Sequence, residues 1–296
     1  MKTRNLLIVI FVIVLLAIVI QSSALAQAAS QGQRVVADRS QTREMNPDKI
    51  EDWRNKTFMG IWAHPDDELS SSGTMAKLVQ NGNKVILVFL TSGNKGSRDL
   101  EMTAERLAKI RRQEDIEANK VLGIPEENLL FLGYDDGMLE YVPEKELVEK
   151  ICRLVRLYRP DAISCFDPGD KVVSWHKTDH RMAAKVALDA ARAAAYHLYF
   201  PHHLINENLQ PFTVVDFFFR GGAAEPNFQV DVTDLAELRA EAFTKHTSQH
   251  GKGNAKYTGP QMDPEDMALR RAAATRKDAD GKIWENFRRV RSSMSF

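Results

Sequence analysis

The sequence predicts an α/β fold, a Rossmann-like open and mostly parallel sheet with helices on both faces. From residue 57 onward, short apolar runs alternate with longer helix-like segments, which is the pattern of a doubly wound sheet. The run from Lys84 to Thr91 is almost continuously apolar, as expected of a strand that is covered on both faces. Gly82, Gly123 and Gly133 stand where elements are expected to end, because glycine commonly interrupts both helices and strands.

The individual elements follow from the same patterns. Strands are expected at residues 57–63, 84–91, 128–132, 161–166 and 212–219. Helices are expected at residues 67–80, 103–122, 144–158, 178–198 and 233–246. We interpret Phe217, Phe218 and Phe219 as core residues of the last strand. Beyond residue 251 the chain is polar, and its charged segment 264–291 is expected to form a helix-like extension that either packs peripherally or is partly mobile.

The composition limits the class of protein. The chain has 296 residues, of which 44% are hydrophobic, enough for one large domain with an appendage. Its 40 basic residues balance 40 acidic ones. A general nucleic-acid-binding protein would normally carry an excess of basic residues, so we expect no nucleic-acid partner.

The N-terminus differs from the remainder of the chain. Lys2 and Arg4 precede an unbroken apolar run over residues 6–20, and the small-residue segment ALAQAA follows at residues 24–29. This pattern is typical of a secretory signal, with a cleavage site near residue 26. The alternative is an uncleaved membrane anchor, although the run is short for a span of roughly 20 residues. Both interpretations predict an exported protein, either periplasmic, extracellular or anchored with its catalytic part outside.

Cys152 and Cys165 are the two cysteines of the chain. Cys152 lies in a helix-like run, and Cys165 lies near the end of a strand-like one. Both therefore resemble small buried hydrophobic residues. Since neither has the spacing of a ligand pair or a redox motif, we expect two free thiols.

The motif AHPDDE at residues 63–68 concentrates side chains that can bind a metal or transfer a proton. It places His64, Asp66 and Asp67 at the turn between the first strand and the first helix. Ligands of open α/β folds bind at the carboxyl ends of strands. Divalent metals are held by imidazole and carboxylate groups. The motif therefore supplies two candidate metal ligands and leaves one carboxylate free to accept a proton.

A third ligand is expected from the segment HKTDHR at residues 176–181. It follows the strand at 161–166 and opens another helix, so two parallel strands would bring their C-terminal loops to one edge of the sheet. His64, Asp67 and His180 would then form a site of two histidines and one carboxylate. This ligand set is typical of catalytic zinc, and non-haem iron uses the same groups.

With these motifs the chain resembles the zinc-dependent de-N-acetylases of the LmbE and PIG-L group. AHPDDE matches the first motif of that family in full. Further similar segments are LTSGNKGS (90–97), IRRQE (110–114), VLG (121–123), FLGYDDG (131–137), DHR (179–181) and KHTSQ (245–249). The resemblance implies an LmbE-like deacetylase domain over residues 51–250. It would be preceded by a signal peptide or anchor (1–26) and a linker (27–50), and followed by a polar C-terminal extension (251–296).

The resemblance also implies roles for individual residues. His64, Asp67 and His180 are similar to the metal ligands of the family, and Asp66 is similar to the general base that takes a proton from metal-activated water. The metal and a histidine would stabilise the oxyanion. Three further polar residues fall where the family places sugar-side or structural polar residues, namely Arg111, Glu114 and Asp136. Of these, Arg111 and Asp136 are expected to contact substrate hydroxyls.

One part of the second motif departs from the family pattern. That motif usually reads His-Pro-Asp-His, whereas His176 lies four residues before His180. His176 either polarises the oxyanion, as a catalytic residue, or is moved away by the additional residue. Asp179 is interpreted as a support for a ligand or as a helix cap.

Two other groups of polar residues have open interpretations. His246 and Gln249 either face the pocket or end a polar helix. The pair at residues 202–203 resembles a metal site only superficially, because it has no accompanying carboxylate at ligand spacing. We interpret that pair as part of a loop.

The function that follows is a zinc-dependent hydrolase acting on linear amide C–N bonds, which removes an N-acetyl or other N-acyl group from an amino sugar or its conjugate. Zn²⁺ is the expected cofactor, with Fe²⁺ as an alternative, and the partner is a small amino-sugar substrate. A membrane tether is expected only if the N-terminus is uncleaved. The alternatives are a hydrolase of another small amide and a carbohydrate-binding protein with a vestigial metal site. A metal phosphoesterase would commonly need a second set of ligands.

Overall fold

The computed structural model describes residues 46–169, 178–221 and 226–291. The chain divides into two units, Met1–Glu44 and Met45–Phe296, and every described residue belongs to the second. The segment expected to be a signal peptide or anchor lies outside the described residues, so its export role stays a prediction. Within the described ranges, no helix combines the length and the apolar character that crossing a membrane requires.

The centre of the fold is one sheet of seven strands in the order β3-β2-β1-β4-β5-β7-β6. The first five in chain order are parallel: β1 (Thr57–Trp62), β2 (Lys84–Thr91), β3 (Leu129–Tyr134), β4 (Ala162–Phe166) and β5 (Asp216–Arg220). The strands β6 (Phe228–Asp231) and β7 (Trp284–Arg291) complete the sheet, with β7 antiparallel to both of its neighbours. The predicted open, mostly parallel sheet is confirmed.

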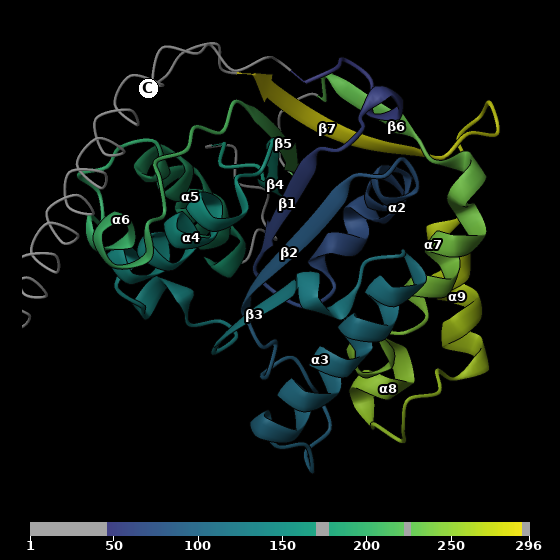
Figure 1. The fold of residues 1–296 in the computed structure, drawn as a ribbon. Helices are drawn as coiled ribbons and strands as arrows, with labels where there is room; N and C mark the ends of the chain where they lie inside the picture. Colours follow the sequence, from purple (N-terminus) through teal and green to yellow (C-terminus); the bar gives the residue numbers. More distant parts are fainter. Residues whose placement is uncertain (1–45, 170–177, 222–225, 292–296) are drawn as a thin grey trace, which may run out of the picture. The chain divides into compact units, whose positions relative to one another are not determined.

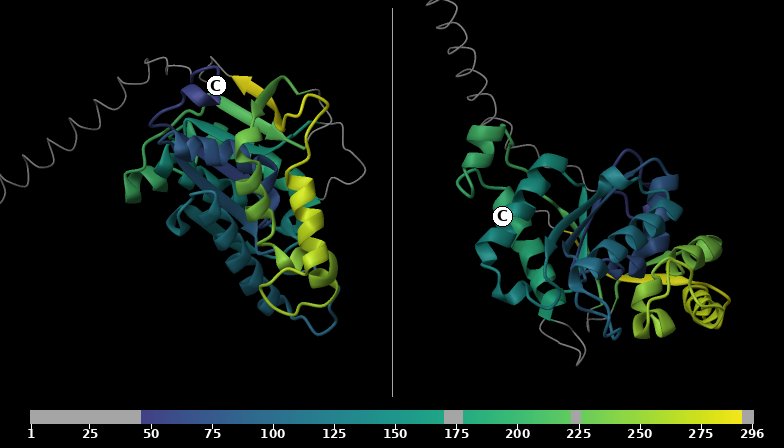
Figure 2. Two further views of the ribbon diagram at one scale, coloured as in Figure 1. Left: turned by 90° about the vertical axis from the view of Figure 1, so that its right-hand side faces the viewer. Right: turned by 90° about the horizontal axis from the view of Figure 1, so that it is seen from below.

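Helices cover both faces of the sheet, as Figures 1 and 2 show. One layer holds α4 (Glu144–Tyr158), α5 (Thr178–Ala194) and the short α6 (His202–Glu207). The opposite layer holds α2 (Ser72–Gln80), α3 (Ala104–Val121), α7 (Ala236–Phe243), α8 (Gly251–Ala255) and α9 (Pro264–Ala274). Short 3₁₀ turns connect the elements at Ile50–Asp52, Asp67–Ser71, Glu126–Asn128, Leu139–Tyr141, Thr233–Leu235 and Thr247–Gln249.

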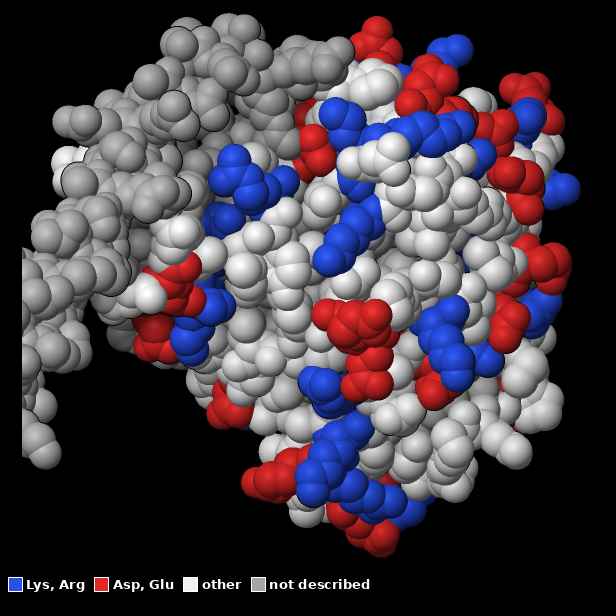
Figure 3. All heavy atoms as spheres, viewed as in Figure 1, with Lys and Arg blue, Asp and Glu red and all other residues white. Residues whose placement is uncertain are grey.

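The core lies between the sheet and these layers. In β1 and β2, every residue beyond the first is buried, which is why both strands read as continuous apolar runs. Phe58, Phe218 and Trp53 pack as an aromatic cluster with ring centroids 5.7–6.5 Å apart. Cys152 and Cys165 are buried free thiols, as predicted. On the face drawn in Figure 3, basic and acidic side chains of the described residues are intermixed, in keeping with the balanced composition.

The helix-like interpretation of residues 264–291 is wrong beyond Ala274. The second half of this segment forms β7, which inserts between β5 and β6 instead of packing peripherally. Its charged residues concealed the strand, because two of them are neutralised by partners inside the fold. Arg289 donates to the buried carboxylate of Asp216, and Arg288 donates to Asp167 at 2.6 and 2.7 Å.

Three boundaries also differ from the sequence prediction. The strand expected from residue 212 begins only at Asp216. The helix expected to reach residue 198 ends at Ala194. There the buried guanidinium of Arg156 donates hydrogen bonds to backbone carbonyl oxygens of residues between 193 and 200. The end of the expected linker packs on the domain, since Asn46 and Ile50 are buried.

Strand β7 also supports the start of α2. The carboxylate of Glu285 accepts the N–H groups of Gly73 and Thr74 at 2.9 and 2.8 Å, and it lies 3.2 Å from Nε of Arg239. Two N–H groups at the helix start, which have no partner within the helix, are thereby satisfied.

We expect Glu285→Ala to destabilise the fold by about 3–5 kcal/mol, because it leaves two N–H groups and a buried guanidinium without their partner. Urea denaturation monitored by circular dichroism measures this. The control is Glu127→Ala, which removes an exposed carboxylate and should stay within about 0.5 kcal/mol of the parent protein. Equal midpoints for the two variants would contradict the role of Glu285.

Candidate metal centre

The site lies where the direction of the strand order changes. Strand β1 pairs with β2 on one side and with β4 on the other, all parallel. The loops that leave β1 and β4 therefore start at the same edge of the sheet and diverge to opposite faces. In open α/β sheets this crevice is where ligands bind. His64 and Asp67 follow β1, and His180 lies in the first turn of α5.

The structure brings the three predicted ligands together. One donor atom from each of His64, Asp67 and His180 lies within 4.8 Å of the others. Nδ1 of His64 is 3.3 Å from Oδ2 of Asp67, and Nε2 of His180 is 3.3 Å from Oδ1 of the same carboxylate. The ring of His180 stacks on Phe166 at 3.9 Å between centroids, so the last residue of β4 orients it.

Two hydrogen bonds between His64 and Asp67 close the loop after β1. Oδ2 of Asp67 accepts the N–H of His64 at 2.7 Å, and the N–H of Asp67 donates to the carbonyl of His64 at 3.3 Å. Between them, Asp66 has a φ of +117°, in a region that residues other than glycine rarely adopt. Strained backbone of this kind is concentrated at functional sites.

The partners of His64 determine which ring nitrogen faces the site. Nε2 lies 3.0 Å from Oδ1 of Asp136 and 3.2 Å from Oδ2 of Asp179. Since both oxygens are acceptors, Nε2 carries a proton. Nδ1 is buried beside Asp67 and has no hydrogen-bond partner among the described residues. The lone pair available to a metal is therefore on Nδ1, which is the arrangement that metal-binding histidines require.

The same carboxylates favour positive charge at this position. Burial lowers the pKa of His64, but the nearby carboxylates of Asp136, Asp179 and Asp67 outweigh it and raise the pKa to about 11. Burial opposes the effect at Asp67 too, where the two histidines hold the pKa of the carboxyl well below its usual range. A cation at Nδ1, whether a proton or a metal ion, is thus stabilised by its surroundings.

Asp179 joins three segments around His64. Its Oδ2 accepts the N–H of Gly137 at 2.6 Å, and its Oδ1 accepts the N–H of Leu139 at 3.1 Å. The interpretation of this residue as a support for a ligand agrees with these contacts. The neighbouring Asp136 is held through its N–H by Oδ1 of Asn94 at 3.0 Å.

Arg111 is engaged with backbone. It is buried, and its guanidinium donates to the carbonyls of Gly93 and Gly96 at 2.6 and 2.8 Å, while Nη1 lies 3.9 Å from Oδ2 of Asp136. A Cβ at Gly96 would come within 2.6 Å of the guanidinium, so this close approach requires glycine there. Arg111 therefore shapes the loop beside Asp136, and its predicted contact with a sugar hydroxyl stays a prediction.

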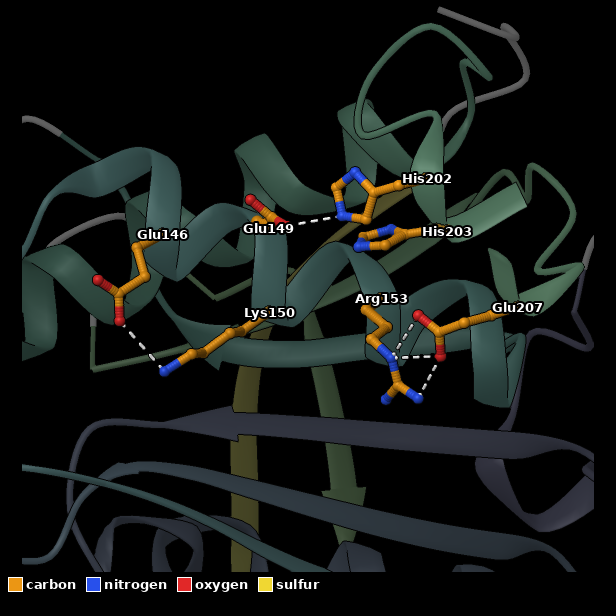
Figure 4. Close-up of a pocket in the computed structure, with 7 residues that line it drawn as sticks. All are labelled: Glu146, Glu149, Lys150, Arg153, His202, His203 and Glu207. Carbon is orange, nitrogen blue, oxygen red and sulfur yellow. Dashed lines mark hydrogen bonds and ion pairs between the residues drawn. The ribbon is translucent and has the colours of Figure 1, made fainter. Parts of the chain in front are cut away.

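A second histidine cluster lies on the surface between α4 and α6, and Figure 4 shows it. The pair at residues 202–203 belongs to α6, so its interpretation as loop is wrong. Nε2 of His202 lies 2.8 Å from Glu149, a carboxylate that sequence spacing did not reveal. Nδ1 of His203 accepts a hydrogen bond from Arg156 at 3.2 Å, because arginine only donates. The proton of neutral His203 is therefore on Nε2, and that nitrogen has no lone pair for a metal.

A third cluster, Glu68, Asp115 and His246, is buried beneath the loop after β1. Nδ1 of His246 lies 3.1 Å from Nε2 of Gln249, which also donates to the carbonyl of Pro65. The amide nitrogen is the donor to both, so neutral His246 carries its proton on Nε2 and is also unsuited to hold a metal. Burial keeps the pKa of His246 well below its usual range, so the ring is neutral.

The carboxyl groups of this cluster form a pair. Burial raises the pKa of Glu68 to about 8, and it raises the pKa of Asp115 well above the usual range. Both shifts favour the neutral carboxyl form, because two buried negative charges close together would be unfavourable.

Sequence reasoning missed one charged residue near the site. Arg270 on α9 interacts electrostatically with Asp66, although burial lowers the pKa of its guanidinium. Its side chain packs over the ring of Phe243 at 4.9 Å. No local motif marks Arg270, since it lies about 200 residues from Asp66 in the chain. The predicted catalytic residue His176 lies outside the described residues.

Comparison with known proteins agrees with this site. Residues 59–191 match the model of the PIG-L family, described as GlcNAc-PI de-N-acetylase. The matched segment contains the three clustered residues His64, Asp67 and His180. The resemblance inferred from the motifs is thus confirmed over this segment of the chain.

Individual proteins are also similar to this chain. The diacetylchitobiose deacetylase of Thermococcus kodakarensis is 29% identical over 197 residues, which are 66% of this chain and 70% of that protein. The mycothiol S-conjugate amidase of Streptomyces coelicolor is 32% identical over 177 residues, which are 53% of this chain and 59% of that protein. The solved structure of N,N'-diacetylchitobiose deacetylase from Pyrococcus horikoshii has a TM-score of 0.66 at 26% identity, covering 80% of this chain and 84% of that one.

The fold alone does not select the reaction. The structure of GalB, the 4-carboxy-2-hydroxymuconate hydratase of Pseudomonas putida, has a TM-score of 0.59 at 17% identity, covering 81% of this chain and 98% of that one. A hydratase and a deacetylase thus share this architecture, so a function has to be argued from the site.

We expect His64→Ala to weaken the binding of a divalent metal by at least about 100-fold, because it removes the lone pair that the surrounding carboxylates orient. Isothermal titration of the metal-free protein measures this. His203→Ala and His246→Ala are the matched controls, and both should bind metal as the parent protein does. Loss of binding in either control, with binding retained in His64→Ala, would contradict the assignment.

Proposed function

We propose that this chain is a metal-dependent hydrolase that removes the N-acetyl group of an amino sugar or of an amino-sugar conjugate. The observation that carries the proposal is the cluster of His64, Asp67 and His180, with Asp66 directly beside it in a strained conformation. The similarity to two diacetylchitobiose deacetylases supports this class of substrate.

The donor set fits a divalent metal, and zinc is the proposed ion. Two imidazoles and one carboxylate leave coordination positions open, as catalytic zinc sites do, and Fe²⁺ accepts the same ligands. Buried Nδ1 of His64, which has no hydrogen-bond partner among the described residues, supports the fit. When bound, a divalent metal supplies Lewis acidity, which polarises the amide carbonyl and makes water a stronger acid.

The side chains would divide the remaining chemistry among them. Asp66 accepts a proton from the attacking water as the new C–O bond forms, and it returns that proton to the amine nitrogen as the C–N bond breaks. The products are acetate and the free amine. Asp136 and Asp179 keep the imidazole of His64 in one orientation throughout, and the positive charge of Arg270 attracts the carboxylate of Asp66.

A different small amide is the second candidate substrate. The similarity to a mycothiol S-conjugate amidase favours testing it, because that protein's name denotes an amidase. Hydrolysis of either candidate substrate would use Asp66 as the base. The mechanism can therefore be tested independently of which amide is the substrate.

Asp66→Asn should lower the rate of deacetylation by about 10²–10⁴-fold, since the amide cannot accept the proton from water. The bound metal content should stay unchanged, because the three ligands are intact. Acetate release from N-acetylglucosamine, diacetylchitobiose and a simple acetamide measures the rate, before and after removal of metal with a chelator. Full metal-dependent activity of Asp66→Asn would disprove the role of Asp66.

A further inference from the structure

The peptide group between Pro65 and Asp66 is held at both of its polar ends. Its carbonyl oxygen accepts a hydrogen bond from Nε2 of Gln249 at 2.8 Å. Its N–H donates to Oε2 of Glu68 at 3.0 Å. Because a peptide group is planar and rigid, two bonds at opposite ends fix the orientation of the whole plane.

The orientation of this plane sets the conformation of Asp66. Rotation of the plane changes ψ of Pro65 and φ of Asp66 together. The φ of +117° at Asp66 is unfavourable for a residue with a Cβ, so an unrestrained loop would rotate the plane away from it. The two hydrogen bonds oppose that rotation.

We propose that Gln249 and Glu68 are positioning residues that clamp the Pro65–Asp66 peptide and thereby aim the carboxylate of Asp66 at the reacting water. This inference rests on the proposed function, in which Asp66 is the base. It gives a role to residues 245–249, the last of the segments that resemble the family. These residues lie outside the segment 59–191 that matches the family model.

Gln249 is itself held firmly. The turn before it is tied to α3 by the buried carboxylate of Glu114, which accepts the hydroxyl of Thr247 at 2.7 Å and both the N–H and the hydroxyl of Ser248 at 2.7 and 2.8 Å. The amide of Gln249 also donates to His246. Three contacts thus fix the turn before Gln249, and a fourth holds its own side-chain amide.

Glu68 is fixed from the opposite direction. Its side chain is fully buried, and its Oε1 accepts Nδ2 of Asn119 on α3 at 3.3 Å. The buried carboxyl of Asp115, also on α3, has an oxygen within 4.8 Å of it. Helix α3 therefore anchors both halves of the clamp, one through Glu114 and the other through Asn119.

The first experiment removes the donor of the clamp. Gln249→Met keeps the side-chain length without the N–H groups, and Gln249→Glu keeps the shape while placing an oxygen against the carbonyl of Pro65. We expect both to lower kcat by about 10- to 100-fold, because displacement of a catalytic group by about 1 Å has an effect of that size. KM and the dissociation constant for zinc should stay within about twofold, since no ligand is touched. Gln261→Met, at an exposed glutamine, is the matched control and should leave all three values unchanged.

Two variants of Glu68, one conservative and one not, test the second half of the clamp. Glu68→Gln retains an oxygen for the N–H of Asp66 and should keep kcat within about threefold, whereas Glu68→Leu should lose about as much as the Gln249 variants. Unfolding midpoints identify any variant that has merely lost stability. The Gln249 side chain is half-buried, so those variants test the proposal even where Glu68→Leu fails to fold.

Crystal structures of the parent protein and Gln249→Met separate the clamp from the proposed function. In the parent, Asp66 should keep a positive φ, and in the variant the peptide should rotate. A parent protein without deacetylase activity would overturn the proposed function, while the two structures would still decide whether the clamp exists. Unchanged kcat and φ in Gln249→Met, or a loss of zinc affinity equal to the loss of kcat, would overturn the clamp.

Discussion

The hydrogen bonds at Nε2 of His64 are the constraint on which the site depends. Two carboxylates, from Asp136 after β3 and Asp179 in α5, face this nitrogen and keep the proton on it. The lone pair of the ring then points from Nδ1 toward Asp67 and His180. Because the carboxylates come from two segments that are distant in sequence, the ring is oriented only when the parallel strands bring these segments to one edge of the sheet. The fold and the chemistry are linked through this one imidazole.

The same physical argument separates this cluster from the other two that contain histidine. Ligand-type residues gather at His203 and His246 as well, but arginine and glutamine amide nitrogens donate to Nδ1 there. Proximity alone would therefore assign a metal site to each of these clusters, and another to His64, Asp136 and Asp179. The hydrogen bonds of the histidine ring nitrogens favour only the cluster of His64, Asp67 and His180. The third cluster has a positioning role instead, because Glu68 accepts the N–H of Asp66 and so holds the peptide group between Pro65 and Asp66.

Much of this arrangement could be predicted from the sequence. The buried strands β1 and β2 read as apolar runs. The expectation that two parallel strands bring their C-terminal loops to one edge of the sheet was enough to predict that His64, Asp67 and His180 lie together. Strand β7 escaped prediction because its arginines pair with Asp167 and Asp216, which neutralises charge that would otherwise exclude them from a sheet. The partners of Arg111 and Gln249 escaped for a related reason. Backbone carbonyls carry no sequence signal, so a side chain that binds them cannot be distinguished from one that binds substrate.

The most direct test of the account is anomalous X-ray diffraction from crystals grown with zinc. We predict one strong peak about 2.0–2.2 Å from Nδ1 of His64, from an oxygen of Asp67 and from a ring nitrogen of His180. An ion held by Nε2 of His64, or by the histidines of α6, would contradict the account. So would an ion bound to His64 and Asp67 that His180 does not reach.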